Sequence, residues 1–107
     1  LLRPAAFARK LESACTLQED KMAHHLLLRV TGEFQNQAEL NARVERSIRS
    51  TDVAGVGSDN AIYLLMNQAE EANLPLLTKR MGEKGLHVIS VPLDEQLRLV
   101  SAAKQEV

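Results

Sequence analysis

Two residues of opposite charge stand three positions apart in the segment Arg49-Ser50-Thr51-Asp52. An arginine guanidinium presents a rigid fork of N–H donors that can clamp a phosphate group, and a carboxylate supplies only acceptors. The pattern alone is weak, because Arg-x-x-Asp arises by chance about once in a few hundred positions at ordinary residue frequencies. A local ion pair that ends a helix explains it equally well, so both interpretations stay open at this point.

The other polar residues offer little for catalysis. His24 and His25 are neighbours at the edge of an expected strand, so their side chains point to opposite faces and cannot chelate one ion together. Gly55-Val56-Gly57 is not followed by the Gly-Lys-Ser/Thr of a phosphate loop. Cys15 stands alone, which excludes an internal disulfide and leaves too few thiols for a zinc site. We therefore expect no catalytic residue, no metal site and no cofactor.

Composition restricts the partners of the chain. Its 107 residues, 45% hydrophobic and 25% charged, describe one globular domain with a single core. The 13 basic and 14 acidic residues are mixed along the sequence, which argues against general affinity for polynucleotides or for membrane surfaces. No apolar run approaches the ~18 residues that span a bilayer. Because Leu1 is not preceded by Met, we expect the chain to be a piece of a larger protein or a processed form.

Periodicity predicts the elements that must position the Arg49–Asp52 segment. Helical spacing of apolar residues predicts helices over 4–16, 36–50, 68–84 and 95–104. Compact apolar runs predict strands over 26–32, 53–56, 61–66 and 86–91, the middle two joined as a hairpin. Residues 26–91 thus run strand, helix, strand, strand, helix, strand. This order predicts an α+β fold in which two helices cover one face of an antiparallel sheet, with further helices at both ends of the chain.

Single residues predict where some helices begin and end. Pro4 suits a first helical turn, and Gly85 is placed to end the third helix. Pro75 should either kink that helix or mark where its regular part begins. Asp94 is expected to cap the last helix.

The stretch from Arg49 to Leu65 resembles the GGDEF family of diguanylate cyclases, in which an Arg-x-x-Asp inhibitory site precedes the GGDEF turn and an apolar strand. Looser similarities extend over nearly the whole chain. Arg3-Pro4-Ala5-Ala6-Phe7 is similar to the opening helix of the family, Leu26–Leu28 to its first strand and Ala102–Lys104 to its closing helix. The family fold is a βαββαβ cyclase palm, which agrees with the predicted order. The resemblance implies that residues 1–107 form a single degenerate GGDEF domain.

The same resemblance implies a binding site for cyclic di-GMP. In the family, an arginine on the helix after the GGDEF strand completes the inhibitory site, and the matching residue here is Arg80, 28 residues beyond Asp52. Arg49 and Arg80 would meet the O6 and N7 acceptors of guanine or clamp phosphate. Asp52 would accept the guanine N1–H and N2–H, a pairing that adenine lacks. The alternative for Arg80 is an exposed helical arginine beside Lys79.

Departures from the family pattern argue against enzymatic activity. Ser58-Asp59-Asn60-Ala61-Ile62 stands where the family has Gly-Gly-Asp-Glu-Phe, and a shift by one residue does not restore the glutamate. Arg29-Val30-Thr31 ends the first strand where active cyclases carry metal-binding aspartates. Joining two nucleoside triphosphates requires a divalent metal that neutralises the phosphates and activates the attacking hydroxyl. We therefore expect a domain that is not an enzyme.

The resemblance favours a non-catalytic cyclic di-GMP receptor of the PelD or BcsE type, which regulates exopolysaccharide synthesis or secretion and hence biofilm formation. Its partners would be polysaccharide synthase or secretion proteins. Its location would be cytoplasmic, including the cytosolic part of an inner-membrane protein or complex. Two alternatives remain: a ligand-free scaffold or dimerisation module in which Arg49 and Asp52 pair with each other, and a diguanylate cyclase with an atypical active site.

Overall fold

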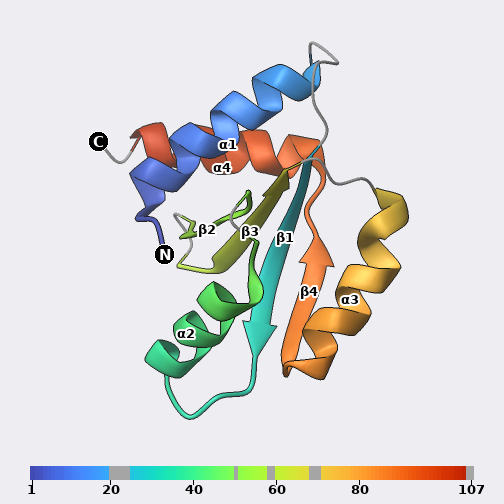
Figure 1. Ribbon diagram of the computed structural model, residues 1–107. Coiled ribbons are helices and arrows are strands. Elements are labelled where there is room, and N and C mark those ends of the chain that lie inside the picture. The colour runs from blue at the N-terminus through green and yellow to red at the C-terminus, as the bar shows by residue number, and fades with distance from the viewer. Residues whose placement is uncertain (20–24, 50, 58–59, 68–70, 106–107) are drawn as a thin grey trace.

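The computed structural model describes residues 1–19, 25–49, 51–57, 60–67 and 71–105 (Figure 1). Its α-helices are α1 (Pro4–Glu19), α2 (Gln37–Ser47), α3 (Leu74–Glu83) and α4 (Leu93–Gln105), with a 3-10 turn, η1 (Glu71–Asn73), before α3. Its strands are β1 (His25–Gly32), β2 (Val53–Val56), β3 (Ile62–Asn67) and β4 (Leu86–Ser90). The predicted α+β class and the order from β1 to β4 are confirmed.

The four strands form one sheet in the order β2-β3-β1-β4, and every neighbouring pair is antiparallel. β1 lies in the interior of the sheet, where Leu28 is opposite Leu64 of β3 and Ser90 of β4. The hairpin expected from Gly57 to Asn60 joins β2 to β3, and Asn60 adopts a positive φ of 67°. Asparagine tolerates this left-handed conformation better than most residues, which explains its position at the turn.

Helices cover both faces of the sheet. One core contains Leu26 and Leu28 of β1 together with residues of α2 and α3, whereas the other contains Leu27 together with residues of α1 and α4. Successive strand residues point to opposite faces, so the Leu26–Leu28 run serves both cores. α1 and α4 pack against each other (Figure 1). The prediction of two helices on one face is therefore right for α2 and α3, but the terminal helices cover the opposite face.

The helix boundaries follow from local chemistry. Asn36 caps α2 by accepting a hydrogen bond from the Glu39 backbone N–H at 2.9 Å. α2 ends at Ser47, earlier than predicted, because Ile48 is extended with ψ 155°, so Arg49 lies outside the helix.

Within the described ranges, no helix is long and apolar enough to cross a membrane.

The third and fourth helices differ in part from the prediction. Pro75 lies in the first turn of α3, where its fixed φ and missing N–H are compatible with a helix, so it marks the start of the regular part. Residues 68–70 of the predicted helix lie outside the described residues. Gly85 follows with φ 80° and ends α3 as predicted. α4 begins at Leu93, so Asp94 lies within its first turn and the prediction that it caps the helix is wrong.

Two glycines offer a test of the fold. A Cβ atom added to Gly55 would lie 2.4 Å from the Phe7 ring, whereas one added to Gly82 would meet nothing within 4 Å. Gly55→Ala is expected to lower the free energy of unfolding by about 1–3 kcal/mol, since the packing of α1 on β2 must shift. Gly82→Ala, in an exposed helical position, is expected to raise it by about 0.5–1 kcal/mol. Urea denaturation of both variants measures this contrast, and equal effects would contradict the α1–β2 packing.

Candidate functional site

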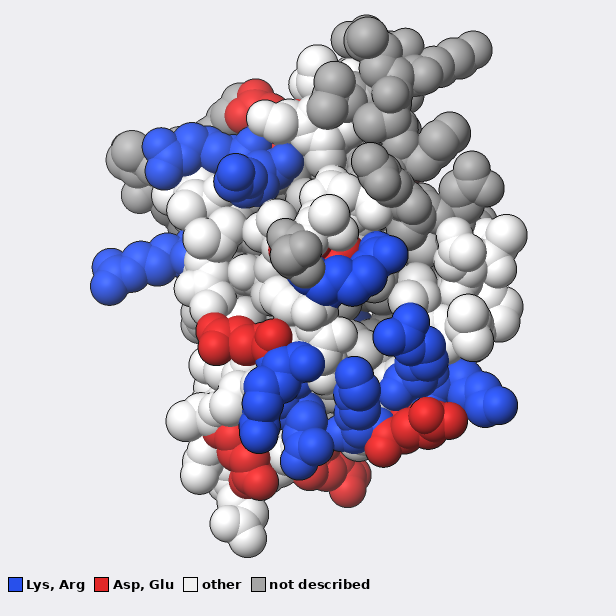
Figure 2. Space-filling view, viewed as in Figure 1, with Lys and Arg blue, Asp and Glu red and all other residues white. Residues whose placement is uncertain are grey.

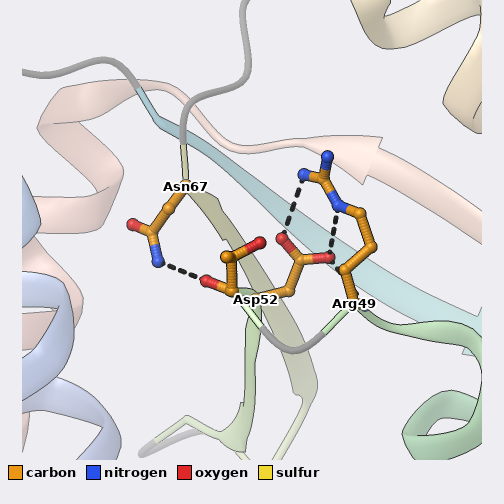
Figure 3. Close-up of polar contacts among 4 residues, drawn as sticks. Arg49, Asp52 and Asn67 are labelled. Atoms are coloured by element: carbon orange, nitrogen blue, oxygen red, sulfur yellow. Dashed lines mark hydrogen bonds and ion pairs between the residues drawn. The ribbon is translucent and has the colours of Figure 1, made fainter.

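The Arg49-x-x-Asp52 segment forms a compact turn between α2 and β2. The Asp52 backbone N–H donates to the Arg49 carbonyl oxygen at 3.0 Å, and the Arg49 backbone N–H donates to Asp52 Oδ2 at 3.0 Å. The Arg49 side chain turns back onto the same carboxylate, with Nε 3.1 Å from Oδ2 and Nη2 3.1 Å from Oδ1 (Figure 3). The two residues therefore form a bidentate ion pair that closes the turn.

The ion pair is asymmetric in its exposure. The Asp52 side chain is 0% exposed, whereas the Arg49 side chain is 53% exposed. Three of the roughly four acceptor positions of the carboxylate are already used by Arg49. In this conformation Asp52 orients Arg49, and its carboxylate does not face solvent, where the N1–H and N2–H of a guanine would arrive.

The electrostatics of the pair keep Arg49 charged. The hydrogen bonds to Asp52, and next the negative charge of Asp52, raise the pKa of Arg49, and partial burial opposes them. A group whose pKa is raised on folding stabilises the folded protein at every pH below the pKa of the unfolded chain. This stabilisation is lost only as the pH rises through the pKa of the folded state. That window lies at strongly alkaline pH, so the cation of Arg49 is fully available in the neutral range.

A further hydrogen bond attaches the turn to the sheet. The Asn67 side-chain amide, at the end of β3, donates to the Thr51 carbonyl oxygen at 2.7 Å (Figure 3). Asn67 pairs with His25 at the start of β1 in the sheet register. The turn is thus anchored to the interior strands as well as to α2, which limits the freedom of the Arg49–Asp52 pair.

Arg80 lies next to this turn. A pocket of about 50 Å³ is lined by Arg49 and Asp52 from the turn, by Arg80 from α3 and by five further residues: Ser47, Met66, Leu77, Met81 and Lys84. The structure therefore brings together the three residues singled out from the sequence, although they come from two separate elements. The sequence analysis did not single out the other residues that line the pocket. Lys84 could have been found from the sequence, because it stands four residues after Arg80, a spacing that places two residues on the same side of a helix.

Basic side chains gather on this side of the molecule. Figure 2 shows Lys and Arg side chains concentrated over the region of α2 and α3, with acidic side chains mainly around them. Among the described residues, neither Arg80 nor Lys84 forms an ion pair, whereas Arg49 is paired with Asp52. Arg43 of α2, which is outside the pocket lining, lies 5.8 Å from the centre of the Phe34 ring, at the distance of a cation–π contact. The surface around the pocket suits an anion.

The other residues considered from the sequence lie elsewhere. His25 is buried, with Nε2 2.7 Å from Gln96 Oε1, while the Gln96 amide donates to the Val91 carbonyl oxygen at 2.7 Å. These hydrogen bonds join β1 to α4, so His25 is part of the buried contact between the strand and the helix. His24, Ser58 and Asp59 lie outside the described residues. Within the part that is described, no group of three His, Cys, Asp or Glu residues is arranged to hold a metal ion.

The end of β1 carries the residues that depart from the cyclase pattern. Arg29 and Thr31 are exposed on the face where Ile89 and His87 of β4 are their cross-strand partners.

Comparison with protein-family models, with curated proteins and with solved structures found no match.

Proposed function

We propose that this domain is a non-catalytic receptor for cyclic di-GMP, with Arg49 and Arg80 as ligand-binding residues and Asp52 as the residue that positions Arg49. The observation that carries the proposal is the shared pocket: Arg49 and Arg80 lie on different elements and line one cavity together with Asp52. Cyclic di-GMP carries two phosphodiester anions and two guanines whose O6 and N7 accept hydrogen bonds. Both features match an arginine fork.

The geometry also supports a division of roles within the site. Arg49 uses Nε and Nη2 for Asp52, yet a guanidinium has five N–H donors and half of this side chain is exposed. The remaining donors can serve a ligand while Asp52 holds the group still. Pre-orientation of this kind improves affinity, because less side-chain entropy is lost on binding.

The size of the pocket restricts the mode of binding. A cavity of about 50 Å³ admits part of one nucleotide, so most of the ligand would lie on the surface over α2 and α3. A self-stacked ligand dimer, or an arginine from a neighbouring domain, would supply additional contacts. As a receptor of this kind, the domain would act in the cytoplasm, alone or as the cytosolic part of an inner-membrane complex. It would regulate polysaccharide synthase or secretion proteins.

The proposal is tested by isothermal titration of cyclic di-GMP into the domain and into Arg49→Ala and Arg80→Ala variants. Each variant is expected to lose at least about tenfold in affinity, since a charge-assisted hydrogen bond contributes about 1.5–3 kcal/mol. Arg46→Ala, which removes an exposed arginine of α2 that does not line the pocket, is the matched control and should bind as the wild type does. Cyclic di-AMP and GTP serve as control ligands. Absence of saturable binding to the wild-type domain would contradict the receptor function.

A second candidate is a ligand-free scaffold or dimerisation module. It is favoured by one observation: the Asp52 carboxylate is 0% exposed and already paired with Arg49, as expected of a purely structural ion pair. The two functions differ in thermal unfolding with excess cyclic di-GMP, because a ligand that binds only the folded state must stabilise it. A melting temperature unchanged by the ligand, with a concentration-dependent oligomeric state, would favour the scaffold.

A further inference from the structure

Among the described residues, Lys84 is the third cation that lines the pocket shared by Arg49 and Arg80. It directly follows α3 as its C-cap residue, one helical turn after Arg80, and both side chains are exposed. Residues four positions apart on a helix project from the same face. The end of α3 therefore directs two positive charges toward the turn that carries Arg49.

These two charges lack a carboxylate partner within the described part of the chain. The ion pairs that side chains form with each other there join Arg49 to Asp52 and Arg98 to Glu95. Like charges that line the same pocket repel each other. An anion placed between Arg80 and Lys84 would remove this repulsion.

A cation at a helix C-terminus also interacts favourably with the helix dipole, which would account for Lys84 without a ligand. That explanation does not require Lys84 to share a pocket with Arg49, which comes from a different element. It also leaves unexplained why, among the described residues that line this pocket, the charged side chains that face solvent are Arg49, Arg80 and Lys84. The carboxylate of Asp52 is 0% exposed and held by Arg49, so these described residues offer cations to an incoming group.

We propose that Lys84 is a phosphate-binding residue of this site. Arg80 and Lys84 hold one phosphodiester group, and the exposed donors of Arg49 meet the acceptor edge of a guanine. That the phosphodiester belongs to a cyclic dinucleotide rests on the proposed function, whereas the presence of an anion site at the end of α3 rests on the pocket itself. Lysine suits this role as a point charge that follows a phosphate without demanding bidentate geometry.

The test compares Lys84→Ala with Lys79→Ala, which removes an exposed lysine of the same helix that does not line the pocket. Titration of cyclic di-GMP is expected to show about a tenfold loss of affinity for Lys84→Ala and no more than about a twofold change for Lys79→Ala. Lys84→Arg should restore binding, since it keeps the charge. Raising the salt concentration should weaken binding less in Lys84→Ala than in the wild type or in Lys79→Ala, because salt screens an exposed lysine–phosphate contact that Lys84→Ala lacks.

The outcomes separate this inference from the proposed function. Wild-type affinity in Lys84→Ala would overturn the role of Lys84 and leave the receptor function standing. If the wild-type domain does not bind cyclic di-GMP, the receptor function fails, and inorganic pyrophosphate becomes the probe in an NMR titration of the same variants. Loss of pyrophosphate binding in Lys84→Ala alone would support the anion site, and absence of binding to the wild-type domain would overturn it. Thermal unfolding of each variant checks that it is folded.

Discussion

Replacing Arg49 with alanine is expected to lower the free energy of unfolding by about 2–3 kcal/mol, more than replacing Asp52 does. The reason is the asymmetry of exposure. Arg49→Ala leaves a carboxylate that is 0% exposed with a single backbone N–H as its remaining partner, and an uncompensated buried charge is costly. Asp52→Ala leaves a guanidinium that is already 53% exposed and can be solvated, so about 1–2 kcal/mol is expected. Solvent that reaches Asp52 in the first variant keeps the loss below the ~3–5 kcal/mol that follows when a fully buried pair loses one partner.

Urea denaturation of the two single variants and of the double variant measures this difference. Because the double variant leaves no unpaired charge, its loss should fall short of the sum of the single losses by at least about 1 kcal/mol. Arg46→Ala provides the control for removing an arginine from the neighbouring surface. Equal losses for Arg49→Ala and Asp52→Ala, with strict additivity, would mean that the pair is not formed in solution.

Replacing Leu27 with alanine is expected to cost about 2–5 kcal/mol, as much as replacing Leu28. The two side chains are both 0% exposed but belong to different cores, Leu27 to the one beneath α1 and α4 and Leu28 to the one beneath α2 and α3. Truncation of a fully buried leucine removes transfer free energy and leaves a cavity. The equality of the two losses is a test of the double-sided arrangement.

Ile89→Ala is the control, since this apolar residue of β4 is 64% exposed and its loss should change stability by no more than about 0.5 kcal/mol. If α1 and α4 did not cover their face of the sheet, Leu27→Ala would resemble Ile89→Ala rather than Leu28→Ala. Chemical denaturation followed by far-ultraviolet circular dichroism distinguishes these outcomes.

Local signals in the sequence predicted most of the fold. The hairpin around Asn60 and the end of α3 at Gly85 depend on backbone preferences of single residues, so they can be predicted without the tertiary structure. For Pro75 the sequence left two possibilities open, a kink in the helix or the start of its regular part, and the structure shows the second. The position of α1 and α4 is a matter of packing between distant segments, and the prediction of helices at both ends of the chain did not assign them to a face of the sheet. The uninterrupted run from Leu26 to Leu28 carried the missing information, because a strand that is apolar at every position must be buried on both sides.

The three residues singled out from the sequence, Arg49, Asp52 and Arg80, line one pocket, and their role in binding a ligand stays a prediction. Sequence gives no measure of side-chain exposure, so the expectation that Asp52 meets a guanine did not foresee that its carboxylate is enclosed by Arg49. Lys84 was overlooked for a different reason: the family pattern has no place for it, although its spacing from Arg80 was visible.

The N-terminal segment has a consequence for the behaviour of the domain at high concentration. The Leu2 backbone N–H donates to the Ala54 carbonyl oxygen at 3.0 Å, and its carbonyl oxygen accepts from the Val56 N–H at 3.0 Å, so Leu2 lies parallel to β2 at Gly55. Open strand edges act as templates for pairing with other chains and promote aggregation. The domain thus occupies the outer edge of β2 with its own backbone, and protection from edge-to-edge association there depends on a few residues ahead of α1.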